Sequence, residues 1–341
     1  MSVDVEGLGP GFASAKRSVV SRGSKARLAT ASLRYGALAT FAAVVVVFSL
    51  TAPFFLTPFN IGNILGQSAI TGILAIGLTV VVIAGGPNVV TGGIDMSLAA
   101  NMGLSAAVYA AMLRAGYSDG LAIVGALGVG LAIGAVNAAA VALIGIIPLL
   151  ATLAVMNVVS GLELVLTENT VIPASSDILS MLSTSSFFGV PALGTVFLVV
   201  AFFIGLLVQR TRFGLRLYAT GEFPEAARAA GLNIKLYVAL AFLISGLCGG
   251  LAGILNTAYL SGSSTGSGEM LLPVVVIALL GSVFSRRLVP TIGGTLLSAL
   301  FIGIILNGFQ LLNLSSTLVS GLQGGLILLT VSATTLIRRQ S

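Results

Sequence analysis

The sequence predicts an all-α, polytopic transmembrane helical bundle with about ten spans. The stretch from Tyr35 to Ile94 contains no charged side chain, whereas one membrane-spanning helix needs only about 20 apolar residues. Hydrophobic residues make up 57% of the chain and charged residues 8%, well below the roughly 25% charge of soluble domains. The strand-like alternation of an outer-membrane barrel is missing. The chain is therefore expected to fold in a bilayer as helices.

Apolar runs separated by polar, glycine-rich or basic segments give the individual spans. The 43 glycines fit this class, because glycine lets transmembrane helices approach closely and marks breaks in them. In chain order the predicted spans are 36–56, 61–84, 94–113, 120–145, 147–166, 190–209, 236–258, 269–283, 289–308 and 314–336.

The distribution of Lys and Arg predicts the orientation of these spans. If the N-terminus is cytoplasmic and the chain alternates, every Lys and Arg except Arg114 falls on the cytoplasmic side. This pattern favours an even number of spans and places both termini in the cytoplasm. The net charge of +6 therefore reflects topology, and we expect no nucleic-acid partner. Residues 1–34 are expected to be a flexible basic cytoplasmic tail, and residues 35–341 the transmembrane domain.

The cytoplasmic loop 210–235 carries the signature of a short helix. Pro224 suits the first helical position, Glu225 the first turn, and Gly231 the position just past the end. A capped helix between two spans suggests a docking element for a partner. The alternative is a plain surface turn that joins the two spans.

A second feature interrupts the membrane region between the second and third spans. Gly85 and Gly86 precede the segment Gly92-Gly93-Ile94-Asp95-Met96-Ser97, and paired glycines break helices. Irregular backbone at membrane depth must be buried in protein or line a wet cavity. Asp95 either caps the following helix or lines a transport pathway, and the two roles can coexist.

Three amide side chains lie inside predicted spans: Asn137, Asn157 and Asn307. They can hydrogen-bond between helices, or they can line a pathway for an uncharged, hydroxyl-rich solute.

The amino-acid composition and motifs exclude most kinds of catalytic, nucleotide-binding and metal site. Histidine is absent, no phosphate-binding loop with the Gly-x-x-x-x-Gly-Lys-Ser/Thr pattern occurs, and no Cys/His cluster could hold a metal. We expect no catalytic residue, no metal site and no cofactor bound by this chain. Any energy input would come from a partner.

Four segments, in order, resemble the permease subunits of bacterial ATP-binding-cassette importers of the ribose/xylose/galactoside type. They cover nearly everything after the N-terminal tail. They are Gly77–Ile83 through Gly92–Ser97, similar to the family's GGIDLS signature; Gly134–Asn137 with Ile147-Pro148 and Ala151–Leu153; Thr211–Gly214 through Tyr218–Gly221 and Glu225–Arg228 with Gly231; and Gly294-Thr295, Gly303 and Asn307-Gly308.

The resemblance implies a type II ABC importer permease-like fold in the bacterial cytoplasmic membrane. It implies a solute of the sugar class, ABC ATPase subunits that use ATP and Mg, a periplasmic solute-binding protein, and a second permease chain, identical or homologous, within membrane lipid. The implied ATPase-coupling residues are Gly221, Glu222, Pro224, Glu225, Ala226, Ala227, Arg228 and Gly231. The residues assigned to the pathway or helix break are Gly92, Gly93, Asp95, Ser97, Asn137, Asn157 and Asn307.

The rival function is a secondary transporter coupled to protons or sodium. Such proteins place ionisable groups at mid-membrane, and this chain offers no histidine and one candidate carboxylate, Asp95. An intramembrane enzyme is disfavoured, because no acid–base or metal constellation exists.

Overall fold

The computed structural model describes residues 35–86, 92–187, 189–266, 270–285, 289–314, 321 and 324–325. Nearly all of this part is helical, which confirms the all-α prediction. The elements are a first helix Tyr35–Thr51, α2 (Pro58–Gly85), α3 (Leu98–Arg114), α4 (Asp119–Ala138) continued by the π-helix η1 (Ala139–Ile144), α5 (Pro148–Thr167), α6 (Asp177–Thr184), β1 (Ser186–Phe187), β2 (Val190–Pro191), α7 (Ala192–Arg210), α8 (Arg212–Glu222), α9 (Pro224–Ala229), α10 (Ile234–Leu260), α11 (Leu271–Val283) and α12 (Ile292–Leu311). The two short strands pair antiparallel.

Six described helices are long and apolar enough to cross a membrane: α2, α4 with η1, α5, α7, α10 and α12. The helix Tyr35–Thr51 and α11 are apolar but shorter, and α3 has 17 residues. A helix overlaps each of the first nine predicted spans, whereas the tenth, at 314–336, and the tail 1–34 lie outside the described residues. The structure therefore confirms the polytopic all-α fold, but it does not confirm the predicted number of about ten spans.

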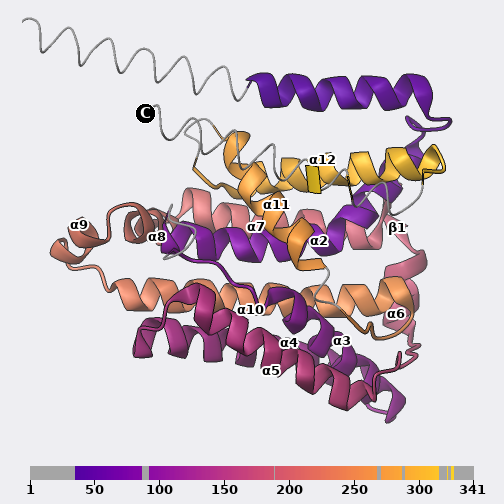
Figure 1. The fold of residues 1–341 in the computed structure, drawn as a ribbon. Helices are drawn as coiled ribbons and strands as arrows, with labels where there is room; N and C mark the ends of the chain where they lie inside the picture. The colour runs from indigo at the N-terminus through magenta and orange to yellow at the C-terminus, as the bar shows by residue number, and fades with distance from the viewer. Residues whose placement is uncertain are drawn as a thin grey trace, which may run out of the picture.

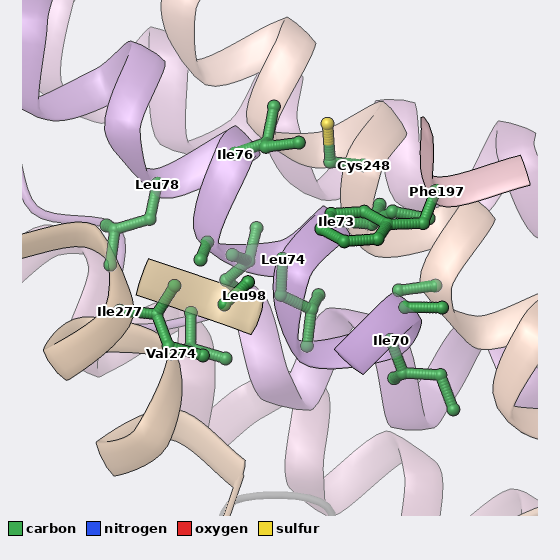
Figure 2. Close-up of a cluster of buried hydrophobic side chains, with 14 of the residues drawn as sticks. Ile70, Ile73, Leu74, Ile76, Leu78, Leu98, Phe197, Cys248, Val274 and Ile277 are labelled. Carbon is green, nitrogen blue, oxygen red and sulfur yellow. The ribbon is translucent and has the colours of Figure 1, made fainter. Parts of the chain in front are cut away.

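Helix α2 occupies the centre of the bundle. Most of its side chains are apolar, several of its polar ones bond within the bundle, and 83% of its most apolar 18 residues are buried. Helices α7, α10, α11 and α12 pack around it (Figure 1). Figure 2 shows its Ile73 and Leu74 among Phe197 of α7, Cys248 of α10 and Ile277 of α11. This helix therefore holds the core together.

Helices α4 and α10 cross with their backbones in contact. An added Cβ on Gly130 would lie 2.8 Å from Gly250 Cα, and one on Gly134 would lie 2.6 Å from Phe242 O. Gly130 and Gly134, like Gly246 and Gly250, are four residues apart on one helix face. This small-xxx-small spacing lets membrane helices approach closely.

The two longest loops lie at opposite ends of the bundle. Helices α8 and α9 form one end, and α6 with β1 forms the other (Figure 1). The segment before α6 is held to the end of α10, since Ser263 N–H donates to Ile172 O at 2.9 Å and Pro173 bridges to Gly262. The predicted cytoplasmic loop 210–235 thus lies at the opposite end of the bundle from α6, while the side of the membrane that each end faces stays a prediction.

The crossing of α4 and α10 predicts that Gly134→Ala lowers stability by about 1–3 kcal/mol, because the new methyl group has no space. Gly128→Ala in the same helix is the control, since a Cβ there meets nothing within 4 Å. The reporter is the chain's single cysteine, the buried Cys248, which a thiol-reactive dye labels as the detergent-solubilised protein unfolds on heating. Equal unfolding temperatures for the two variants would contradict this account of the crossing.

Candidate functional site

The chain breaks its helical course between α2 and α3. Helix α2 ends at Gly85, and Gly86 has a φ of +82°, a backbone conformation that glycine adopts at little cost. After residues 87–91, which lie outside the described part, Gly92 to Asp95 run without helix and are buried. Helix α3 starts at Leu98. The irregular backbone is therefore surrounded by protein, which is the condition for it to exist in a membrane.

Asp95 lies at the centre of a buried hydrogen-bond network, with 1% of its surface exposed. Its Oδ1 accepts from Ser97 N at 3.1 Å, from Ser97 Oγ at 2.7 Å and from Asn137 Nδ2 at 3.3 Å. Its Oδ2 accepts from Ser245 Oγ at 2.8 Å. Asn137 Nδ2 also donates to Ser97 Oγ at 2.7 Å. The carboxyl group thus joins the break to α4 through Asn137 and to α10 through Ser245.

Thr152 connects the break to a further helix, α5. Its hydroxyl accepts from Met96 N at 3.1 Å and lies within hydrogen-bond distance of Pro148 O and Ile94 O, at 2.9 and 3.3 Å. Thr152 of α5 therefore holds the backbone on both sides of Asp95, while Asn137 of α4 and Ser245 of α10 hold its carboxyl group. We call Asp95, Ser97, Asn137, Thr152 and Ser245 the Asp95 network.

The N-cap position of α3 is occupied by Ser97, whose side chain makes no capping bond, so Asp95 is not the N-cap residue of this helix. The bond from Ser97 N–H to Asp95 Oδ1, two residues earlier, instead forms a local Asx turn just before α3. All four bonds lead into packed protein, and the carboxyl group is not exposed. A role in the pathway stays a prediction.

The three predicted amides differ in their surroundings. Asn137 belongs to the Asp95 network, and Asn307 forms two reciprocal bonds with Asn60 of α2, at 2.8 and 2.9 Å. Asn157 donates to Leu153 O of its own helix at 2.9 Å and is exposed. Two amides therefore join helices, and Asn157 presents a polar group on the outer surface of α5.

Sequence reasoning missed Asn101 of α3. Its Nδ2 donates to Gly130 O at 3.3 Å and to Gly246 O at 3.2 Å, where α4 and α10 cross. A lone amide among small apolar residues was the available signal, the same one that identified Asn137. Ser245 was also missed, and a serine in a membrane helix gives no comparable signal.

The loop 210–235 contains the short helix that was predicted, α9. Pro224 stands at its first position, and Gly231, with a φ of +81°, ends it. Leu232 N–H donates to Ala227 O at 3.0 Å and closes the C-terminal cap. Gly221 and Glu222 belong instead to the preceding α8.

The residues assigned to coupling divide into exposed and buried ones. Glu225 and Arg228 form an ion pair at 3.2 Å, with side chains 83% and 66% exposed. Glu222, Pro224 and Ala226 are also exposed. Gly221 and Ala227 are buried and face the bundle. Phe223, which was not singled out, is 66% exposed between α8 and α9.

Comparisons with known proteins place the chain among transport components. A family model described as the permease component of a branched-chain amino acid transport system matches residues 60–331. The D-allose transport system permease protein AlsC of Escherichia coli K12 is 31% identical over 90% of this chain and 93% of its own length. The ribose import permease protein RbsC of Bacillus subtilis is 32% identical over 84% and 88%. No solved structure matches.

The Asp95 network predicts that Asp95→Ala lowers stability by about 2 kcal/mol or more, because Ser97, Asn137 and Ser245 lose a buried acceptor. Dye labelling of Cys248 on heating measures the change. Asn157→Ala is the matched control, since its amide bonds only its own helix, and we expect its unfolding temperature to stay near that of the natural protein. An Asp95→Ala protein as stable as this control would refute the structural role of the carboxyl group.

Proposed function

The chain belongs to the permease components of ATP-binding-cassette importers of simple sugars, and on this premise we propose that it carries a sugar or sugar-like solute across the bacterial cytoplasmic membrane. The observation that carries the proposal is its similarity, over most of both chains, to permeases named for D-allose, ribose and L-arabinose. A secondary transporter coupled to ions is not favoured, because these relatives belong to import systems of the ABC type.

The proposed assembly contains two permease chains, ATPase subunits that bind ATP and Mg, and a periplasmic protein that delivers the solute. We infer about ten passes with both termini in the cytoplasm, from the distribution of Lys and Arg. This chain supplies the translocation pathway, and its ATPase partner binds and hydrolyses ATP. The basic segment 210–235 then faces the ATPase, and the segment 167–189 faces the periplasm.

We assign the docking surface for the ATPase to the exposed residues around α9. An exposed aromatic side chain, Phe223, lies beside an exposed ion pair, Glu225 with Arg228. Aromatic and arginine side chains are the commonest anchors of protein interfaces. The C-terminal end of α9 is capped and Pro224 fixes the backbone at its first position, so the helix is formed before a partner binds, which lowers the entropy cost of docking.

We assign the translocation pathway to the exposed face of α5 that carries Asn157. The side chains of Val158 and Leu162 on the same helix are 64% and 53% exposed, so the face lacks a cover within one chain. A polar amide on a surface that faced only lipid would be costly. A second permease chain opposite α5 would enclose this amide, where it can hydrogen-bond a hydroxyl-rich solute.

Glu225→Lys tests the docking surface. The side chain is exposed and its ion pair contributes little to stability, so folding and membrane insertion should be unchanged. We expect the ATPase subunit to co-purify at least tenfold less, because two adjacent cations then replace the ion pair on the docking surface. Glu168→Lys, on the opposite end of the bundle, is the control. Normal co-purification with Glu225→Lys would exclude α9 as the docking element.

Asn157→Ala tests the pathway. We expect the unfolding temperature and the binding of the ATPase to stay unchanged, while ATP-driven uptake falls several-fold because the solute loses a hydrogen-bond partner. Uptake at the natural rate would remove Asn157 from the pathway.

Reconstitution in liposomes tests the function itself. With its ATPase and binding protein, the chain should accumulate radiolabelled ribose, allose or arabinose only when ATP is supplied. Uptake driven by a proton or sodium gradient through the chain alone would overturn the proposal.

A further inference from the structure

We propose that contacts between glycine backbones form a mechanical link from the docking helices to the Asp95 network. The link runs from Gly221 of α8 to Gly86 and Gly85 at the end of α2, and from there to Gly93 in the break. The inference rests on the proposed function, since it explains how ATPase docking at α9 would move groups inside the membrane. We call these four residues the glycine link.

The first contact joins α8 to the end of α2. An added Cβ on Gly221 would overlap Ile83 O and lie 2.9 Å from Gly86 N. In turn, a Cβ on Gly86 would overlap Gly221 O. The two backbones therefore touch with no side chain between them. Helix α8 ends at Glu222 and α9 starts at Pro224, so this contact lies directly beside the docking surface.

The second contact joins the end of α2 to the break. A Cβ on Gly85 would overlap Gly93 N, and one on Gly93 would overlap Val81 O. Neither residue has room for a methyl group. The contact is through space and bypasses residues 87–91. A displacement of the last turn of α2 would therefore move the segment that carries Asp95.

The Asp95 network begins two residues after Gly93. Ile94 O lies 3.3 Å from Thr152 Oγ1 of α5, and Asp95 binds Asn137 of α4 and Ser245 of α10. Movement of Gly93 would therefore be shared by three helices. One of them, α5, carries the exposed Asn157 assigned to the pathway.

Helix α8 is also held by two side-chain contacts. Arg216 donates to Tyr237 Oη of α10 at 3.2 Å, and Tyr218 Oη donates to Pro290 O at 2.7 Å. Burial, and then the charge of Glu222, raises the pKa of Tyr218 to about 12. Side chains can rotate to absorb movement, whereas backbone atoms in close contact cannot. Protein interiors compress little, so the glycine link transmits displacement more directly than these side-chain bonds.

The test is Gly221→Ala in the complex with ATPase and binding protein, reconstituted in liposomes. The methyl group separates α8 from α2 and leaves the exposed residues of α9 unchanged. We expect the ATPase to bind and hydrolyse ATP at a rate near that of the natural complex, while the solute transported per ATP falls at least tenfold. Gly93→Ala should give the same loss from the other contact, and Gly128→Ala, in open space, should give none.

An unchanged ratio of solute to ATP in Gly221→Ala would overturn the inference. If the natural complex itself showed no ATP-driven uptake, the proposed function would fail instead, so the two failures are distinguishable. If the variants do not fold, hydrogen–deuterium exchange in the natural complex provides a second test. Adding ATP should change exchange in α8 and in residues 92–97 together, and a change in α8 alone would also overturn the inference.

Discussion

A polar group inside a bilayer must find its partner within the protein, and the break before α3 is where this chain meets that constraint most acutely. Helices satisfy their own backbone, but residues 92–97 do not form one. Thr152 binds the amide of Met96, and Asp95 binds the amide of Ser97. The carboxyl group then needs further donors, which Asn137 and Ser245 supply. The packing of α4, α5 and α10 around this point follows from a break in a single segment of chain.

The same constraint explains how the central helix is held. Apolar surface gives little preference for one helix neighbour over another in lipid, so specificity comes from close packing and a few polar bonds. Helix α2 is bonded to α12 at three levels: through Asn60 with Asn307, through Gln67 with Gln310, and through the hydroxyls of Thr79 and Thr295, which lie 2.7 Å apart. Asn101 likewise binds carbonyl groups of both α4 and α10 at their glycine crossing. Each polar bond fixes a pair of helices that would otherwise be free to slide.

These features give the two ends of the bundle different properties. The end formed by α8 and α9 exposes charges and an aromatic ring. Its inner side touches the end of α2 without any intervening side chain. Glycine thus serves two purposes in this chain. It lets the backbone leave the helix, and it lets separate segments meet at backbone distance.

The sequence by itself determined the features that depend on local rules. Long apolar runs locate helices because lipid demands them, and Pro224 and Gly231 bound α9 because their preferred backbone conformations act within one turn. Only the tertiary structure decided which polar groups meet. Ser245 lies 150 residues from Asp95, and Asn60 lies 247 residues from Asn307. Lipid requires that each such group be paired, yet it does not specify the partner. In the same way Gly128 and Gly130 are equivalent in sequence, but one faces open space and the other touches a backbone, because that difference arises only when α10 packs against α4.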